Sequence, residues 1–409
     1  MISISELETK GINIRFAKSP WLFNNQVIHL NDSQINEQNV ALVRIKGTNK
    51  IGIYNKNSLI SVRFFADEIN NYIENNFIQK NKLTKFLLNH LIALKNTKSS
   101  FLFSQTEAYR LAHGDNDFLP SIAIDFYQSV FVLQISSTVG EFLLPFITDA
   151  LKEFSILPIF ERSTGQIRKL EQLPERTRWI REPQNVSQFS VQCAFANLNM
   201  TFYLNKAQKT GLFLDQRLNL KYLEYIISPY KVDTVLDICS YAGAWSASAA
   251  KLGANQMTLI DQDAWALNLA KSNILANTEK PVSIDTLHGD MFEHLQKLNK
   301  DNKSFNLIIA DPPAFAKAKK HIHEASRAYS RLAKLASKLL TANGILVICS
   351  CSRHISDEVF LTAISEGFDN NNNWVLLHKG EQSPCHTRLA NAESSEYLKC
   401  YFIQKRILN

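Results

Sequence analysis

The feature that most constrains the fold is the stretch Val235–Asp261, which reads VLDICSYAGAWSASAAKLGANQMTLID. An apolar run carries Asp237 near its end, a turn of small residues follows, and an alanine-rich amphipathic segment closes at Gly253. A second apolar run then ends on Asp261. This pattern predicts a strand, a tight loop, a helix and a second, parallel strand. We therefore expect an open α/β sheet that binds its ligand outside the carboxyl ends of the strands.

The loop after the first strand indicates what kind of ligand would bind there. Backbone N–H groups at a helix N-terminus suit a carboxylate or a phosphate, and Asp261, 24 residues after Asp237, is placed to hold a ribose. The loop lacks Gly-x-Gly-x-x-Gly, which disfavours a dinucleotide. Asp237 would repel a pyrophosphate but suits a cation, such as the α-ammonium of S-adenosylmethionine. The alternative is an ordinary βα unit in which the acids only cap strands.

Two later strand ends carry further candidate residues. Asp290 follows a predicted third strand, where its carboxylate can accept from an adenine amino group or cap the helix that begins at Met291. The fourth strand ends in the run Asp311–Phe315, DPPAF. Its two prolines make a rigid turn and remove two backbone donors, so the remaining carbonyls can accept from the amino edge of a base. Phe315 offers a face for stacking.

The fifth strand ends in ICSCSRH and supplies a candidate nucleophile. Side chains alternate along a strand, which places Cys349 and Cys351 on the same side. Cys351 is expected at the mouth of the sheet and Cys349 in the core. A catalytic thiol needs nearby positive charge, and Arg353 and Lys317 are candidates to supply it. Lys317 and Lys319 belong to a basic segment that is either a phosphate-binding rim or a solvated helix start.

The remaining chain predicts three domains: residues 1–67, 68–184 and 185–409. The first contains short β-type runs typical of a small barrel or curled sheet, with strands expected at Ile12–Phe16, Trp21–Phe23, Val40–Ile45, Ile51–Tyr54 and Leu59–Phe65. Residues 68–97 have helical spacing, and residues 98–184 read as an α+β domain. Residues 175–187 are polar and basic and indicate a linker. The third domain alternates strands and helices, which predicts a doubly wound sheet.

Composition limits the functional classes. A hydrophobic content of 45% and a charged content of 20% are globular values, and a net charge of +7 permits a polyanionic partner. The six cysteines are scattered and form no Cys-x-x-Cys pair, so we expect neither a disulfide framework nor a zinc or other metal site. With no apolar run long enough to span a membrane and no signal-peptide core, a cytoplasmic protein is expected.

Several motifs resemble one enzyme family in the same order along the chain. The segments VLDICSYAGAW, ID at 260–261, GDMF, DPPAFAKAKK and SCSRH resemble class I S-adenosylmethionine-dependent methyltransferases of bacterial ribosomal RNA. The branch most similar to the chain methylates cytosine C5 in 23S rRNA. KSPWLF at 18–23 and IGIYNKNSLISVRF at 51–64 resemble its N-terminal RNA-binding PUA domain, and AYRLAHGDNDFLPSIAIDFY and IFERS its central domain. AQKTGLFLDQRLNL and EYLKC resemble segments that flank its Rossmann-like catalytic domain.

The resemblance implies a role for each matching position. S-adenosylmethionine would be held by Asp237, Tyr241, Gly243, Asp261, Asp290, Met291, Asp311 and Pro312. Asp311 would also assist catalysis, with Cys351 as the attacking thiolate. Ribosomal RNA of the 23S type would be contacted by Lys209, Arg217, Phe315, Lys317 and Lys319. A homodimer is one candidate assembly.

The chain also departs from the family pattern. Ala244 stands where the family has a second glycine, and Pro120-Ser121 replaces a proline-glycine pair. Two other functions stay open. One is methylation of a base nitrogen, for example in guanine, which needs no thiolate; the other is an RNA-binding assembly factor that has lost catalysis.

Overall fold

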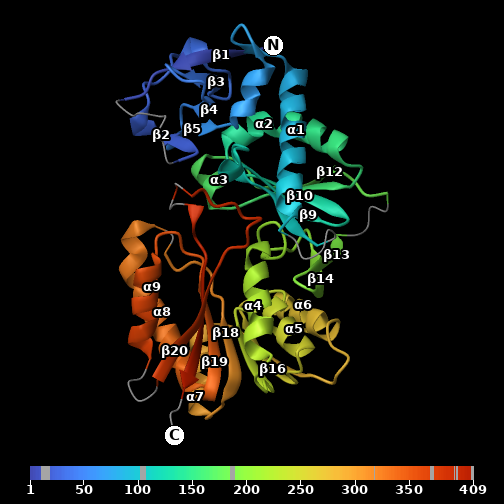
Figure 1. Ribbon diagram of the computed structural model, residues 1–409, viewed down its shortest axis with the longest axis vertical. Helices are drawn as coiled ribbons and strands as arrows, with labels where there is room; N and C mark the ends of the chain where they lie inside the picture. The colour runs from blue at the N-terminus through green and yellow to red at the C-terminus, as the bar shows by residue number, and fades with distance from the viewer. Residues whose placement is uncertain are drawn as a thin grey trace. The chain divides into compact units, whose positions relative to one another are not determined.

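The computed structural model describes residues 1–10, 19–101, 107–184, 189–316, 318–368, 373–390, 392 and 395–406. The chain forms two compact units, drawn in Figure 1. The first unit comprises Met1–Cys193, Tyr203–Leu212 and Pro384–Ser395, and the second comprises Ala194–Phe202, Phe213–Ser383 and Glu396–Asn409. The boundaries that we expect at residues 67 and 184 stay predictions.

The second unit contains a seven-stranded sheet in the order β17-β16-β15-β18-β19-β21-β20. Strands β17 to β19 run parallel, and β21 is antiparallel to both of its neighbours. The strands are β15 (Thr234–Ile238), β16 (Gln256–Asp261), β17 (Ser283–His288), β18 (Phe305–Ala310), β19 (Leu340–Ser350), β20 (Asn373–Glu381) and β21 (Lys399–Arg406). The predicted Rossmann-like α/β architecture of this part of the chain is confirmed.

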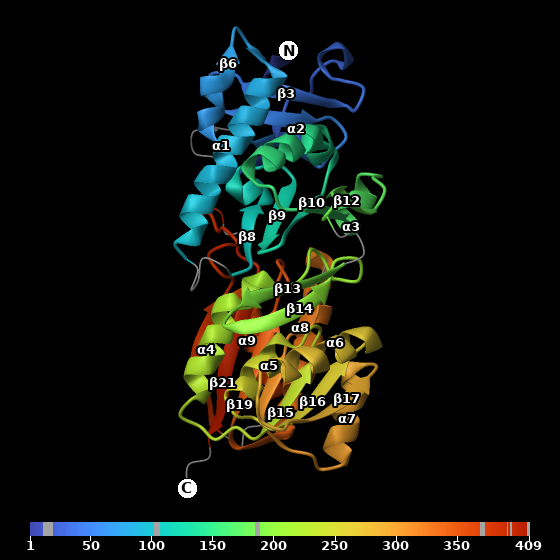
Figure 2. The same cartoon turned by 90° about the vertical axis from the view of Figure 1, so that its right-hand side faces the viewer.

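Helices cover both faces of this sheet, as Figures 1 and 2 show. One layer contains α4 (Arg217–Ile227), α5 (Ala244–Lys251) and α6 (Ala264–Leu275). The other contains α7 (Met291–Lys300), α8 (Ile322–Lys338) and α9 (Asp357–Gly367), which share a buried apolar core with the sheet. The strand order reverses at β15, whose neighbours are β16 and β18. Such a reversal leaves a crevice at the carboxyl ends of the strands.

The first unit contains two sheets. The N-terminal sheet has the order β2-β5-β4-β3-β1-β7-β6 and the other has the order β12-β11-β10-β9-β8. The strands of the first are β1 (Ile2–Leu7), β2 (Trp21–Phe23), β3 (Val40–Ile45), β4 (Ile51–Asn55), β5 (Ile60–Phe64), β6 (Ile73–Glu74) and β7 (Phe77–Ile78). Four expected strands are therefore present; the fifth, Ile12–Phe16, lies outside the described residues, as does Lys18 of the PUA-like motif. The PUA-like identity of this sheet stays a prediction.

The second sheet of this unit packs with two long helices. Its strands are β8 (Tyr109–His113), β9 (Ile122–Tyr127), β10 (Val130–Ile135), β11 (Ile159–Ser163) and β12 (Arg176–Arg181). The helices are α1 (Lys80–Ser99) and α2 (Thr138–Phe154), and the short α3 spans Gln166–Leu170. Ser121, which replaces the family glycine, keeps a left-handed backbone with φ 61°. None of the helices in the described parts of the chain combines the length and the apolarity that crossing a bilayer requires.

Two expectations about the first unit were wrong. Residues 68–78 form a 3-10 turn and the hairpin of β6 and β7, not a helix, because Asn75 and Asn76 both adopt positive φ and make a tight two-residue turn. The expected linker at 175–187 contains the edge strand β12, whose Arg176 and Arg178 pair with the buried Glu161 of β11. β13 (Ser190–Phe195) and β14 (Leu198–Tyr203) form a separate two-stranded sheet.

Candidate active site

The predicted site residues of the second unit follow the carboxyl ends of five parallel strands. Asp237 is the second-last residue of β15, and Asp261 is the last residue of β16. Asp290 comes shortly after β17, Asp311 directly follows β18, and Cys351 directly follows β19. Because parallel strands end at the same edge of a sheet, these side chains share one edge. The strand ends therefore bring four acids and one thiol together at one edge of the sheet. We call this set the strand-end cluster: Asp237, Asp261, Asp290, Asp311 and Cys351.

The loop after β15 has an unusual backbone. Cys239, Tyr241 and Gly243 all adopt positive φ, at 62°, 45° and 75°. At Gly243 a Cβ atom would lie 2.8 Å from the Cβ of Ala270 on α6, so a side chain would collide there. Ala244 begins helix α5 and is not among the residues with positive φ. Its methyl group is therefore compatible with the local backbone, unlike a methyl group on Gly243.

Asp237 is fully buried beneath this loop. Its Oδ2 accepts a hydrogen bond from the Ser246 hydroxyl at 2.7 Å, while its Oδ1 has no partner among the described residues. Burial raises the pKa of Asp237 to about 7, and the charges of Asp311 and Asp261 add to this rise while the Ser246 hydrogen bond opposes it. A buried acceptor without a partner is rare and marks a place where a ligand donor fits.

Asp261 and Asp290 are anchored by backbone donors. Asp261 accepts from the N–H of Tyr241 and the N–H of Asp263, both at 2.9 Å, which fixes its carboxylate at the end of β16. Asp290 caps α7 by accepting from two N–H groups of its first turn, so the capping role is confirmed. Its contact with adenine stays a prediction. Met291 is largely buried and its sulfur lies 3.7 Å from that of Cys239.

Asp311 is held by two residues that the sequence did not identify as functional. The Gln216 side-chain amide donates to its Oδ2 at 3.0 Å, and the Trp245 indole donates to the same oxygen at 3.2 Å. The side-chain amide of Asn219 on α4 in turn donates to the side-chain oxygen Oε1 of Gln216 at 2.6 Å. The side chains of three segments thus orient one carboxylate. The only available signal was that Gln216 lies inside the family-like run FLDQR.

Cys351 lies beside the proline turn. Its Sγ is 3.9 Å from the carbonyl oxygen of Pro312, and its side chain is partly buried. Phe315 packs on the ring of Tyr329 with the centroids 4.7 Å apart, and the Tyr329 hydroxyl donates to Ser350 next to the thiol. Cys349 lies in the core as predicted, where burial raises its pKa well above the usual value.

The predicted RNA-contacting residues have different surroundings. Lys319 is exposed at the start of the 3-10 turn Lys319–His321, and Lys209 is an exposed residue of the first unit. Lys317 lies outside the described residues. Arg217 is only 1% exposed, with its guanidinium over the ring of Phe195 at 5.3 Å. This buried setting does not favour the predicted contact of Arg217 with RNA.

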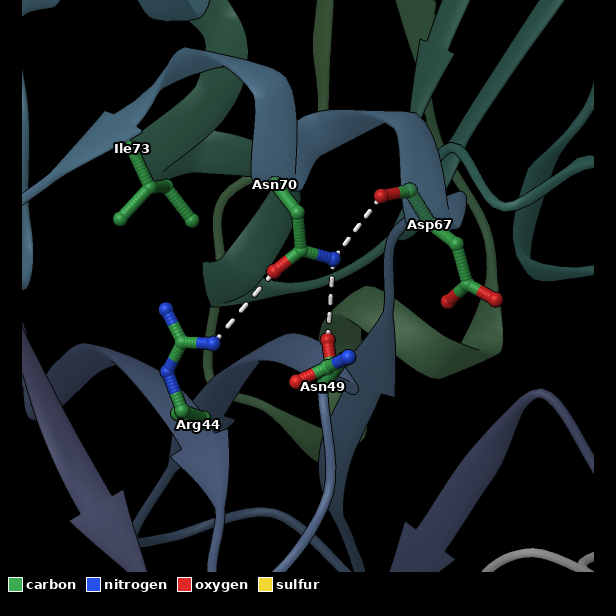
Figure 3. A pocket seen from close by; sticks show the side chains of 5 residues that line it. All are labelled: Arg44, Asn49, Asp67, Asn70 and Ile73. Carbon is green, nitrogen blue, oxygen red and sulfur yellow. Dashed lines mark hydrogen bonds between the residues drawn. The ribbon is translucent and has the colours of Figure 1, made fainter.

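A separate pocket lies in the first unit, and Figure 3 shows its side chains. Its volume is about 480 Å³, and the residues lining it are Arg44, Asn49, Asp67, Asn70 and Ile73. The Asn70 side chain organises the pocket, since it accepts from Arg44 at 3.4 Å and donates to the carbonyl oxygens of Asn49 and Asp67. No residue of this pocket belongs to the strand-end cluster.

The strand-end cluster fits S-adenosylmethionine. The free acceptor of Asp237 suits an ammonium group, and the anchored Asp261 suits ribose hydroxyls. The three acids Asp237, Asp261 and Asp311 lie close enough to shift one pKa, so the edge is electronegative and favours a cationic ligand. The absence of a side chain on Gly243 lets the loop pack tightly against α6.

Comparisons with known proteins agree with this chemistry. A family model described as S-adenosylmethionine-dependent methyltransferase matches residues 116–381. A putative ribosomal RNA large subunit methyltransferase of Methanocaldococcus jannaschii is 33% identical over 298 residues, which are 73% of this chain and 74% of the relative. Ribosomal RNA large subunit methyltransferase I of Alteromonas mediterranea is 28% identical over 93% of this chain and 94% of its own.

Solved structures show the same fold. A putative SAM-dependent methyltransferase from Streptococcus mutans has a TM-score of 0.77 at 18% identity, covering 98% of this chain and 100% of its own. A putative methyltransferase complexed with SAH has a TM-score of 0.75 at 19% identity, covering 99% and 100%. The matched family model spans more than half of the chain and includes the whole strand-end cluster. The chain therefore belongs to the family of S-adenosylmethionine-dependent methyltransferases.

Proposed function

We propose that this protein methylates ribosomal RNA of the large subunit, and that its target is C5 of a cytosine in 23S rRNA. The names of the relatives from Methanocaldococcus jannaschii and Alteromonas mediterranea support the RNA class. A net charge of +7 is compatible with a polyanionic substrate. The choice of C5 rests on the thiol at the sheet edge.

The observation that carries this choice is the position of Cys351. Its sulfur lies 3.9 Å from the carbonyl oxygen of Pro312. Pro312 directly follows Asp311, which belongs to the proposed cofactor site. A base nitrogen attacks with its own lone pair and needs no covalent adduct at a neighbouring carbon, whereas C5 of cytosine has no lone pair and becomes nucleophilic when a thiolate adds to C6. A thiol beside the proline turn therefore has a chemical use in C5 methylation that it lacks in nitrogen methylation.

The mechanism assigns a step to each group. When bound, S-adenosylmethionine would supply an electrophilic methyl group and leave as S-adenosylhomocysteine. The Cys351 thiolate adds to C6 of a flipped cytosine, which makes C5 electron-rich, and C5 then takes the methyl group. A base removes the C5 proton, the pair of electrons re-forms the C5–C6 double bond, and the C6–S bond breaks to release the thiolate. Asp311, oriented by Gln216 and Trp245, is placed to hydrogen-bond the cytosine edge.

The test is methyl transfer by a Cys351→Ser variant to 23S rRNA from cells that lack the gene. We expect the variant to bind S-adenosylmethionine with unchanged affinity but to form no 5-methylcytosine by nucleoside mass spectrometry. Cys349→Ala is the matched control on the same strand, and it should retain transfer because Cys349 is a core residue. Normal transfer by Cys351→Ser would refute the thiolate mechanism while leaving methyl transfer itself intact.

RNA containing 5-fluorocytidine separates C5 chemistry from nitrogen methylation. Fluorine cannot leave as the proton does, so the C5 mechanism predicts a covalent complex that survives denaturing electrophoresis. A nitrogen methyltransferase would form none. The inactive assembly factor is disfavoured by Ala244, since that residue has an ordinary helical backbone. Titration calorimetry tests it directly, and no heat with millimolar S-adenosylmethionine would support the inactive factor.

A further inference from the structure

Lys399 is a buried lysine that lies against the chain on both sides of the proposed nucleophile, at Ser350 and Ser352. It is 7% exposed and begins β21, whose antiparallel register with β19 places Lys399 opposite Ser350. Ser350 is the residue before Cys351. Lysines are almost never buried to this extent without a partner, so the position of its charge needs an explanation.

The ammonium group of Lys399 is held by backbone oxygens. Its Nζ donates to the carbonyl of Ser352 at 3.2 Å and lies 3.5 Å from the carbonyl of Tyr397. Among the described ion pairs, none includes Lys399. The Ser352 contact holds the positive charge against the peptide group that joins Ser352 to Arg353, one residue beyond Cys351.

The nearby acid is already engaged by other groups. Asp357 of α9 accepts from Lys379 at 2.9 Å and from the Tyr401 hydroxyl at 2.7 Å. Burial lowers the pKa of Lys399 and the charge of Lys379 adds to this fall, while the charges of Asp357, Glu396 and a thiolate at Cys351 oppose it. An electrostatic effect is mutual, so an ammonium group that a thiolate stabilises must stabilise the thiolate equally.

Among the described residues, Tyr329 and Arg353 also lie near the thiol, and neither supplies a buried charge like that of Lys399. Tyr329 of α8 donates its hydroxyl near Ser350 and Ser352, and burial raises its pKa to about 12, so it is neutral. Arg353 is exposed, with its guanidinium 5.9 Å from the centre of the Tyr397 ring. Charge in water is screened far more than charge in the interior.

We propose that Lys399 is a positioning residue that stabilises the thiolate of Cys351 through its buried ammonium group. This inference rests on the proposed role of Cys351 as the nucleophile. The thiol proton passes to solvent, the sulfur keeps the electron pair, and Lys399 itself gains and loses no proton in the step.

The test measures alkylation of Cys351 by iodoacetamide against pH, with the Cys351 peptide quantified by mass spectrometry in the full-length protein. We expect Lys399→Met to raise the pH midpoint of alkylation by about one unit and to slow alkylation at pH 7.5 by about tenfold. Lys399→Arg keeps the charge and should return the midpoint to within about 0.3 units. Lys405→Met is the matched control on β21, because Lys405 donates to the Leu340 carbonyl instead.

The outcomes distinguish this inference from the proposed function. An unchanged midpoint in Lys399→Met, or a larger shift in Arg353→Met, overturns the role of Lys399 even if Cys351→Ser is inactive. If the alkylation midpoint shifts in Lys399→Met but Cys351→Ser methylates normally, Lys399 stabilises the thiolate electrostatically, and this thiolate has no role in catalysis. If Lys399→Met lowers the unfolding temperature, Lys399→Arg decides, since rescue of both folding and midpoint supports the charge. Failure of Lys399→Arg to move the midpoint back refutes the proposal.

Discussion

Replacing Asp237 with asparagine should make the protein more stable and at the same time weaken cofactor binding. The carboxyl group is fully buried, and one of its oxygens has no partner among the described residues. Asparagine has nearly the same shape and can keep the hydrogen bond from Ser246, but it carries no charge. Stability and function are therefore expected to change in opposite directions at this position.

The effect on stability follows from the pKa of Asp237. Burial raises this pKa from 3.8 to about 7, so the folded protein holds the proton to a higher pH than the unfolded chain does. The group is neutral in both states below about pH 4, its contribution to stability falls as the pH rises to about 7, and it is constant above that. A shift of about 3 units corresponds to at most about 4 kcal/mol. A buried amide without a full set of partners costs about 1–3 kcal/mol, so we expect a net gain of about 1–3 kcal/mol at pH 7.5.

The effect on binding can be measured as the number of protons that the protein releases when the cofactor binds. If the Asp237 carboxylate receives the ammonium group of S-adenosylmethionine, binding must expel the proton that Asp237 holds near neutral pH. With a pKa of about 7, titration calorimetry in buffers of different ionisation enthalpy should show release of about 0.8 protons at pH 6.5 and about 0.2 at pH 7.5. Asp237→Asn should release none and should bind at least about 30-fold more weakly, from a lost charge pair of at least about 2 kcal/mol.

Asp285→Asn is the control, since Asp285 is an exposed acid on β17 of the same sheet. Its stability, its affinity for cofactor and its proton release should all match the wild type. The reasoning is refuted if Asp237→Asn binds S-adenosylmethionine as tightly as the wild type, or if wild-type binding releases no proton at pH 6.5.

Two further predictions concern packing and buried charge. Gly243→Ala should reduce the free energy of unfolding by about 2–4 kcal/mol in urea titrations and abolish cofactor binding, because the new Cβ would meet Ala270 at 2.8 Å. Gly47→Ala is the control, since Gly47 has φ +72° and no atom within 4 Å of the added Cβ, so it isolates the backbone cost of about 1–2 kcal/mol. Equal losses of stability in the two variants would contradict the collision with Ala270. Lys98→Met should lower the free energy of unfolding by about 3–5 kcal/mol in the same titrations, because it leaves Asp117 charged and buried. Adding Asp117→Asn should restore part of this loss. A double variant no more stable than Lys98→Met would argue against a stabilising ion pair.

The parts of the fold that the sequence predicted are those governed by local pattern. Strands Trp21–Phe23 and Val40–Ile45 have the bounds expected from their local pattern, and the alternation after residue 234 specified the doubly wound sheet. The hairpin at residues 73–78 was missed although its Asn-Asn pair is a usable turn signal. Isoleucines at helical spacing masked it, so the wrong period was read.

The parts that could not be predicted depend on partners distant in the sequence. Strand β12 looked like a polar linker because its arginines are stabilised by Glu161, which lies on a neighbouring strand. The acids at the sheet edge could be placed from the sequence because each lies at or just beyond the end of a strand, while their roles toward the cofactor stay predictions. Gln216 and Lys399 were missed, since each contacts the site only after segments about 95 and 47 residues apart come together.

The placement of β21 between β19 and β20 also bears on how the protein is made. Residues 399–406 lie between β19 and β20, so a nascent chain still attached to the ribosome must present both neighbouring strands with an unfilled space between them. Until these residues leave the exit tunnel, β19 keeps an open hydrogen-bonding edge that invites pairing with other chains. Lys399 arrives with the same segment, so the sheet closes here, and the lysine reaches the chain around Cys351, only after β19 and β20 have been made.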